Sequence, residues 1–222
     1  MRENPATMTS PKLCVVDYGM GNVASVVNAF EFLDVEAEVT SSPAALERAD
    51  AIILPGVGAF GEAMENLHAR DLVDALDTAV RGPARKPFLG ICLGMQLVAA
   101  ESSELGQTRG LGWIEGKVRA LPADETHVSP HVGWLDIEFN DADPLFARIP
   151  QDGCFYFDHS YYLEVAGYTS GVARYGQPFT AVLRADNIFG TQFHPEKSQR
   201  NGLKLLRNFV NYCLARRNAE AA

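Results

Sequence analysis

The sequence has little basic charge and no long apolar run. Lysine and arginine number 19 against 28 aspartate and glutamate residues, which gives a formal net charge of -9. No basic cluster is long enough to overcome this repulsion from phosphates, so we expect no nucleic-acid partner. No apolar run approaches the roughly 20 residues of a membrane span, and residues 1–11 lack the apolar core of a signal peptide. We therefore expect a cytoplasmic chain without a membrane partner.

Cysteine is also scarce, and the four residues lie far apart without a C-x-x-C pair: Cys14, Cys92, Cys154 and Cys213. This spacing favours neither a zinc site nor a disulfide framework. His127 and His131 are four residues apart, but Pro130 between them disfavours a helical pair of metal ligands. We expect no metal and no cofactor, and we interpret the cysteines other than Cys92 as packing residues.

The remaining composition is that of a globular chain, with 47% hydrophobic and 21% charged residues among 222. It predicts one α/β domain at residues 12–217, between loose tails at 1–11 and 218–222. Strands and helices alternate in the first half, which predicts a mostly parallel sheet. The second half is rich in short strands, which predicts partly antiparallel pairing there. The expected strands are 12–17, 35–40, 51–54, 88–91, 111–121, 131–139, 153–158, 161–165, 171–174 and 179–193, and the expected helices are 23–33, one from Pro43, 62–68, 72–80, 93–100 and 201–217.

Cys92 lies where an apolar run gives way to a helical pattern. Residues 88–91 have strand character, and apolar residues recur at helical spacing over 93–100. Gly90 and Gly94 flank the cysteine, as in the sharp strand-to-helix elbow that presents a nucleophile. A helix N-terminus stabilises a thiolate by at most ~2 kcal/mol, so a nucleophilic thiol here also needs a base. The alternative is a buried packing cysteine.

Two glycine-containing loops follow earlier strands. The turn at Gly19 and Gly21 has an incomplete phosphate-binding fingerprint because residue 24 is alanine, so we expect a tight structural turn. The loop 55–61 should share one rim with Cys92, because the carboxyl ends of parallel strands meet at one edge of a sheet. Glycines on both sides of Val57 would let its N–H turn inward, as an oxyanion hole requires; a plain βα turn is the alternative.

A candidate base follows the last expected strand. His194 and Glu196 are two residues apart, so in an extended backbone their side chains point the same way. The carboxylate can then accept from one imidazole nitrogen while the other faces a thiol. Such a pair is usually a solvent-exposed one, but after a strand and beside a thiol elbow it is the natural base.

These motifs resemble those of the triad (class I) glutamine amidotransferases, with their G-x-C-x-G elbow and H-x-E pair. More narrowly, the chain resembles the glutaminase subunits of imidazole glycerol phosphate synthases over nearly its whole length from Lys12. The matching stretches are 17–22, 55–58, 90–96, 130–134, 159–162 and 194–198. Two residues depart from that pattern: Leu135 stands where asparagine is expected, and Asp158 adds a charge before His159.

The resemblance implies a three-layer, flavodoxin-like α/β fold and a catalytic triad of Cys92, His194 and Glu196. It implies that backbone N–H groups of Val57 and Leu93 stabilise an oxyanion. It also implies a glutamine site formed by Gly58, Gln96, Glu104, Ser160 and Tyr161. The implied partner is a (β/α)8-barrel cyclase, which uses the ammonia to form imidazole glycerol phosphate and an aminoimidazole carboxamide ribotide. The residues expected toward it are Asn22, Trp134 and Lys197.

Other interpretations stay open at this point. Without the resemblance, Gln96 also fits a polar helix residue, Glu104 a solvated helix end, and Tyr161 and Trp134 core positions. The chain could instead be the glutaminase subunit of another amidotransferase, of the pyridoxal phosphate or anthranilate type. It could also be a non-catalytic binding subunit that retains the fold.

Overall fold

The computed structural model describes residues 10–151 and 153–220. Most of the expected N-terminal tail therefore lies outside the described residues, as do residues 221–222. None of the helices in the described part of the chain combines the length and apolarity that a bilayer crossing requires.

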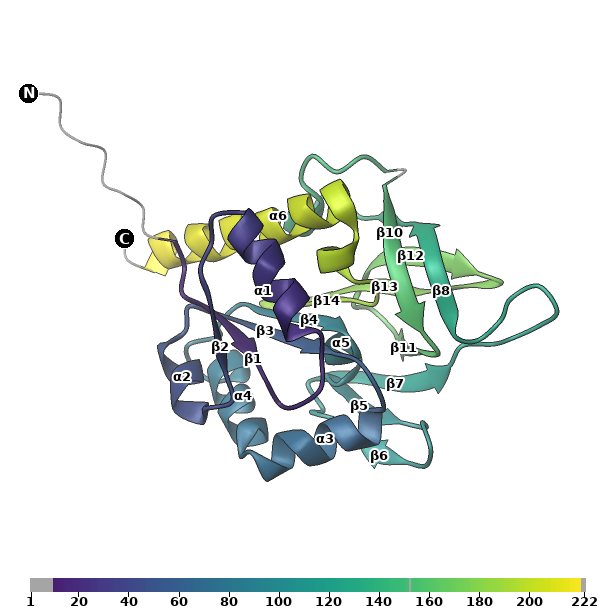
Figure 1. Ribbon diagram of the computed structural model, residues 1–222, viewed down its shortest axis with the longest axis horizontal. Helices are drawn as coiled ribbons and strands as arrows, with labels where there is room; N and C mark the ends of the chain where they lie inside the picture. The colour runs from purple at the N-terminus through teal and green to yellow at the C-terminus, as the bar shows by residue number, and fades with distance from the viewer. Residues whose placement is uncertain (1–9, 152, 221–222) are drawn as a thin grey trace, which may run out of the picture.

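An eight-stranded mixed sheet forms the centre of the molecule (Figure 1). Its strands, in spatial order, are β2 (Ala37–Thr40), β1 (Leu13–Val16), β3 (Ala51–Gly56), β4 (Phe88–Cys92), β14 (Ile188–Thr191), β13 (Gln177–Ala185), β12 (Thr169–Tyr175) and β9 (Glu138–Phe139). The five strands from β2 to β14 pair in parallel, and the remaining pairs are antiparallel. The predicted parallel first half and the partly antiparallel second half are both confirmed.

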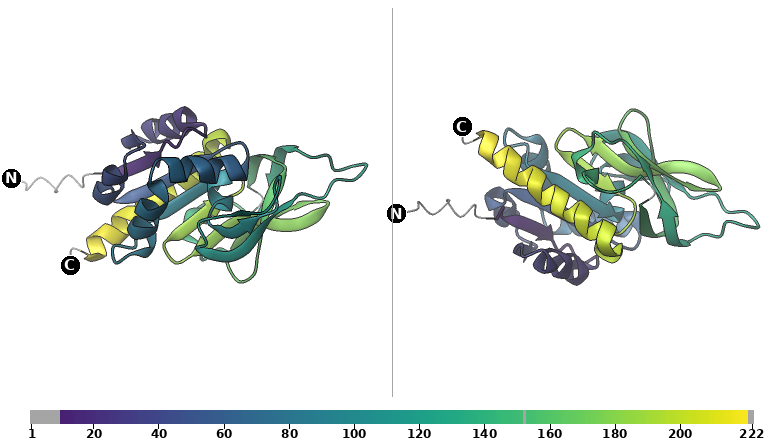
Figure 2. Two further views of the ribbon diagram at one scale, coloured as in Figure 1. Left: turned by 90° about the horizontal axis from the view of Figure 1, so that it is seen from below. Right: turned by 90° about the horizontal axis from the view of Figure 1, so that it is seen from above.

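Helices cover both faces of this sheet. The helices α1 (Val23–Phe32) and α6 (Gln199–Glu220) pack on one face, and α2 (Pro43–Arg48), α3 (Phe60–Ala69) and α4 (Leu72–Arg81) pack on the other (Figures 1 and 2). Because both faces are covered, all four residues of β1 are buried and apolar. The helix α4 buries Leu72, Leu76 and Val80, which recur every fourth residue along one side. The three-layer α/β prediction is confirmed.

Two smaller sheets extend from the carboxyl edge of the parallel strands. One pairs β8 (His131–Asp136) with β10 (Cys154–His159), and the other has the order β11 (Tyr161–Val165), β7 (Ile114–Ala120), β5 (Ala99–Ser102), β6 (Thr108–Arg109). The other helical segments of the described residues are short: α5 (Leu93–Gln96), η1 (Pro144–Phe146) and η2 (Pro195–Lys197). These sheets place β10 and β11 beside the end of β4.

The predicted elbow helix over 93–100 is wrong in length. The helix α5 ends at Gln96, and residues 99–102 form β5, which pairs with β7 and β6. The apolar residues at 97–99 are buried because they continue into this strand pairing rather than along a helix. A four-residue helix has a weak macrodipole. A basic side chain is therefore more important than this helix for stabilising the thiolate form of Cys92.

Other boundaries differ in simpler ways. The expected strand 179–193 is a hairpin of β13 and β14, which turns at Asp186, a residue with φ of 54°. Asn187 in that turn donates to the carbonyl oxygens of Val80 and Lys86 at 2.9 and 2.8 Å. The last helix runs to Glu220, so residues 218–220 are helical rather than part of the expected tail.

Candidate active site

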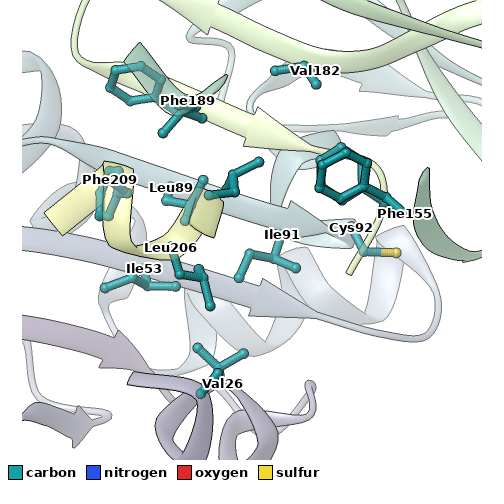
Figure 3. Close-up of a cluster of buried hydrophobic side chains, with 14 of the residues drawn as sticks. Val26, Ile53, Leu89, Ile91, Cys92, Phe155, Val182, Phe189, Leu206 and Phe209 are labelled. Atoms are coloured by element: carbon teal, nitrogen blue, oxygen red, sulfur yellow. The ribbon is translucent and has the colours of Figure 1, made fainter. Parts of the chain in front are cut away.

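Cys92 lies at a sharp corner between β4 and α5. Its backbone has φ 54° and ψ -110°, a conformation that residues with side chains rarely adopt. A Cβ at Gly94 would lie 1.8 Å from the carbonyl oxygen of Leu54, and one at Gly90 would lie 2.5 Å from the carbonyl oxygen of Gly94. The predicted glycine requirement is thus explained by backbone contact on both sides. In Figure 3 the sulfur of Cys92 points away from Ile91 and the apolar cluster around it.

His194 and Glu196 follow β14, the strand directly beside β4. The Nδ1 atom of His194 lies 2.8 Å from Oε1 of Glu196, and the two side chains are 2% and 1% exposed. The backbone here is tied to β10, because the His194 N–H donates to the Tyr156 carbonyl at 2.9 Å and the Ser198 hydroxyl donates to the His194 carbonyl at 2.6 Å. The carboxylate therefore fixes a proton on Nδ1.

The other ring nitrogen of His194 is available for chemistry. Among the described residues, no atom makes a hydrogen bond to its Nε2. Burial disfavours a charged imidazole, but interactions with Cys92 and Glu196 outweigh it and raise the pKa of His194 from 6.5 to about 10. A proton on the imidazole beside Cys92 is thus favoured at neutral pH, as expected of a base that has accepted the thiol proton.

Two buried glutamines form a hydrogen-bonded chain next to the sulfur of Cys92. Gln192 approaches Cys92 Sγ with its Nε2 at 3.7 Å, and Gln96 Nε2 donates to Gln192 Oε1 at 3.0 Å and to the Tyr161 carbonyl at 2.9 Å. Gln96 was predicted as a substrate contact, but its amide nitrogen is already engaged within the protein. The role of Gln192 was missed, because a glutamine two residues before His194 carries no sequence signal of its own.

A pocket of about 240 Å³ opens beside the sulfur. This volume is slightly below the roughly 300–1,000 Å³ of typical small-molecule pockets, which suits a small substrate. The lining residues include every predicted oxyanion and substrate residue together with the nucleophile: Val57, Gly58, Cys92, Leu93, Gln96, Glu104, Ser160 and Tyr161. Pro130, Asp158 and His159 complete the lining. His194 and Glu196 are absent from it, so the base pair approaches Cys92 from outside the pocket.

Two titratable side chains of the pocket wall have well-defined environments: the Glu104 carboxylate is fixed by a hydrogen bond, and the His159 imidazole is uncharged. Glu104 accepts from the backbone N–H of Phe60 at 2.7 Å, at the start of α3, which places the carboxylate at a positive helix end. It is therefore not the solvated helix end that its sequence context also allowed. Burial lowers the pKa of His159 to about 4, and its Nδ1 donates to the Tyr161 carbonyl at 3.0 Å. His159 is thus uncharged at neutral pH and adds no second cation near His194.

Residues 55–58 comprise the end of β3 and the two residues after it, and Val57 and Gly58 line the pocket. They are hereafter called the oxyanion loop, after the role that the sequence predicts for them. Gly56 pairs with Cys92 in the parallel register of β3 and β4. Gly58 has φ of 101°, and a Cβ there would lie 2.6 Å from Cε of Met20. The side chain of Val57 is 40% exposed. The loop therefore has glycines at the positions where its backbone is crowded or left-handed.

The residues predicted to face a partner come from three elements: Trp134 from β8, Lys197 from η2 and Asn22 from the start of α1. Trp134 on β8 is 43% exposed and contacts the ring of Tyr156 edge-on at 5.9 Å, so it is not a core residue. Lys197 lies 5.5 Å above the same ring. Asn22 caps α1 by accepting from the Ser25 N–H at 3.3 Å. This capping role accounts for an asparagine at position 22 without any contact to a second protein.

The two departures from the family pattern have different environments. Leu135 alternates with Trp134 along β8 and packs partly buried against the apolar cluster below the sheet. The carbonyl oxygen of Asp158 lies 3.8 Å from Cys92 Sγ, while its side chain is exposed beside Val132 on the neighbouring strand. Leu135 is therefore a packing residue, and Asp158 adds a negative charge to the rim of the pocket.

The remaining cysteines and histidines lie in separate environments. Cys14 and Cys213 are buried and Cys154 is partly buried, and no disulfide joins the four cysteines. Burial raises the pKa of Cys14 to about 12, so this thiol stays protonated. Within residues 10–151 and 153–220, no group of three or more histidine, cysteine or acidic side chains could hold a metal ion.

Comparison with known proteins agrees with this geometry. The family model "Glutamine amidotransferase class-I" matches residues 14–213. The subunit HisH 1 of imidazole glycerol phosphate synthase from Campylobacter jejuni subsp. jejuni is 45% identical over 199 residues, which cover 89% of this chain and 98% of that protein. The HisH subunit from Symbiobacterium thermophilum is 46% identical over 202 residues, which cover 89% of this chain and 92% of that protein.

Solved structures share the fold at lower identity. A glutamine amidotransferase crystal structure superposes with a TM-score of 0.71 at 19% identity, covering 90% of this chain and 98% of that chain. The structure of PurLQS from Thermotoga maritima gives a TM-score of 0.69 at 20% identity, covering 92% and 99%. At this identity the likeness establishes the fold alone. Together with the sequence relatives, it shows that the chain belongs to the class-I glutamine amidotransferase family, in the group formed by the HisH subunits of imidazole glycerol phosphate synthase.

Proposed function

We propose that this chain is a glutaminase subunit that hydrolyses glutamine to glutamate and ammonia with Cys92, His194 and Glu196. The observation that carries the proposal is the arrangement around one sulfur. A buried imidazole held by a carboxylate approaches Cys92 from one direction, and a pocket of about 240 Å³ opens beside the same sulfur. The base and the pocket for a small substrate therefore both lie next to the nucleophilic sulfur of Cys92.

The proposed first step transfers the thiol proton of Cys92 to Nε2 of His194. The thiolate then attacks the side-chain amide carbon of glutamine, and a carbon–sulfur bond forms as the carbonyl oxygen becomes an oxyanion. Backbone N–H groups of Val57 and Leu93, which flank the pocket, stabilise that oxygen. Each such donor contributes roughly 3 kcal/mol, or about 100 to 1000-fold in rate.

In the second half of the reaction, the imidazolium of His194 gives its proton to the leaving nitrogen. Ammonia departs as the carbon–nitrogen bond breaks and a γ-glutamyl thioester remains on Cys92. The neutral imidazole then activates a water molecule, which hydrolyses the thioester to glutamate. Glu104, Ser160 and Tyr161 hold the substrate, with the Glu104 carboxylate placed to attract the amino group.

We propose that the second subunit of a synthase consumes the ammonia. The names of the relatives, as subunits of imidazole glycerol phosphate synthase, support this proposal. We propose that this second subunit is a (β/α)8-barrel cyclase that docks over Trp134 and Lys197. It would form imidazole glycerol phosphate and an aminoimidazole carboxamide ribotide in histidine biosynthesis. Docking keeps ammonia out of bulk water, where protonation would remove its nucleophilicity.

A coupled assay tests this function. The purified chain is combined with the cyclase subunit, and product formation is followed with glutamine and, separately, with ammonium salts. Cys92→Ala should abolish the glutamine-dependent reaction and leave the ammonium-dependent one intact. Cys154→Ala, at a partly buried thiol on β10, is the matched control and should retain both. Glutamine hydrolysis by Cys92→Ala at the wild-type rate would contradict the assignment.

The same assay separates the alternatives. A glutaminase subunit for pyridoxal phosphate or anthranilate formation would yield product only with the corresponding acceptor enzyme. A non-catalytic subunit would form no covalent adduct on Cys92 with a glutamine-like electrophile in the presence of the cyclase. The buried, hydrogen-bonded pair of His194 and Glu196 favours the catalytic interpretation, because a binding module has no use for it.

A further inference from the structure

The hydroxyl group of Tyr18 is buried without a hydrogen-bond partner. The residue is 0% exposed, and no atom of the described residues accepts from or donates to this hydroxyl. A buried polar group without a partner is unfavourable, and most native proteins avoid it. A phenylalanine would fill the same space without that cost. We therefore expect the Tyr18 hydroxyl group to form a hydrogen bond in another state of the protein.

The position of Tyr18 identifies the segment that could supply this partner. A Cβ on Gly56 would lie 2.4 Å from the Tyr18 hydroxyl oxygen, 2.9 Å from Cβ of Leu93 and 3.1 Å from the backbone nitrogen of Gly94. The hydroxyl thus lies against Gly56 in the oxyanion loop and close to the start of α5. Burial, and then the charge of Cys92, raise the pKa of Tyr18, so the phenol stays a hydrogen-bond donor.

We propose that Tyr18 is a positioning residue that holds the oxyanion loop in its active orientation by donating its hydroxyl hydrogen to the carbonyl oxygen of Gly56. The two ends of a peptide group move together. When the peptide between Gly56 and Val57 turns its N–H toward the pocket, its carbonyl oxygen turns to the other side. Tyr18 offers that oxygen a preformed, buried donor. This inference rests on the proposed glutaminase function, whose oxyanion hole uses the same peptide.

Tyr18→Phe tests the proposal, because it removes only the hydroxyl and keeps the ring. In the complex with the cyclase, we expect kcat for glutamine hydrolysis to fall about 10-fold with little change in KM, since the hydrogen bond acts on the transition state. The ammonium-dependent reaction of the cyclase should be unaffected. Alkylation of Cys92 by iodoacetamide, which needs no oxyanion hole, should also keep its rate. Tyr212→Phe, on α6 across the sheet, is the control.

Each outcome has a definite meaning. A selective loss of kcat in Tyr18→Phe, with normal thermal melting and normal alkylation, supports the proposal. A kcat equal to that of the wild type overturns it, as does an equal loss in Tyr212→Phe. A fall in melting temperature that slows alkylation in parallel also overturns it, because it indicates a purely structural role. A wild-type complex that does not hydrolyse glutamine refutes the proposed function itself, which keeps the two failures distinct.

Discussion

The Nδ1 atom of His194 lies 2.8 Å from Oε1 of Glu196, and both side chains are almost completely buried. The carboxylate selects the tautomer and the orientation in which Nε2 is free for Cys92. In serine proteases, replacing the corresponding aspartate by asparagine lowers kcat by about 10⁴ because it selects the wrong tautomer. The short, buried contact here joins the same two groups, a carboxylate oxygen and the Nδ1 of a histidine.

Glu196→Gln should therefore lower kcat for glutamine hydrolysis by about 100-fold or more while the fold is retained. The amide can keep the size and some hydrogen bonding of the carboxylate, but it removes the charge that stabilises the imidazolium. Steady-state assays with the cyclase, together with circular dichroism as the control for folding, measure this effect. A variant with wild-type turnover would remove Glu196 from the triad.

The pH dependence of stability gives a second prediction. Burial opposes the charged form of His194, yet Cys92 and Glu196 raise its pKa from 6.5 to about 10. A pKa raised in the folded state contributes stability that is complete below pH 6.5 and is lost as the pH rises toward about 10. The difference in unfolding free energy between wild type and His194→Gln should shrink over this range in urea titrations. A difference that stays constant from about pH 6.5 to about 10 would show that the imidazole is buried in its neutral form.

The third prediction compares an elbow glycine, Gly94, with a helix glycine, Gly61. Gly94→Ala places a Cβ 1.8 Å from the carbonyl oxygen of Leu54, so we expect a loss of several kcal/mol or failure to fold. Gly61→Ala in α3 meets its nearest atom, Thr108 Oγ1, at 3.5 Å. That helix substitution should stabilise by roughly 0.5–1 kcal/mol. Thermal and urea unfolding measure both, and equal effects would show that backbone contact at the elbow is unimportant.

The two tryptophans should separate partner binding from stability. Trp134→Ala removes an exposed ring and should weaken affinity for the cyclase by about 10-fold or more, with little effect on melting. Trp113 is partly buried, contacts Phe88 edge-on at 5.0 Å and donates to Asp77 at 3.0 Å. Trp113→Ala should cost about 2 kcal/mol of stability and leave affinity unchanged. Isothermal calorimetry and unfolding curves distinguish the two, and a reversed pattern would place the interface elsewhere.

Those features that depend on local spacing were predictable from the sequence. The glycines around Cys92 and the two-residue spacing of His194 and Glu196 are local patterns, and the parallel order of strands then brings them to one edge. The structure confirms that both motifs follow adjacent strands. Their catalytic roles, and those of the pocket residues, stay predictions.

Features that depend on distant packing were not predictable. The length of α5 is decided by the pairing of β5 with β7, more than ten residues further along the chain. Gln192 reaches Cys92 only because β14 lies beside β4. The unpaired hydroxyl of Tyr18 depends on the loop that covers it. Single-sequence periodicity carries no information on such contacts.

The place of β14 in the sheet has a consequence for biosynthesis of the protein. This strand comes late in a chain of 222 residues, yet it fills the centre of the sheet between β4 and β13. A polypeptide still emerging from the ribosome, or one cut short before residue 188, lacks both this middle strand and the imidazole that follows it. Under the proposed mechanism, such unfinished chains lack the base and cannot hydrolyse glutamine.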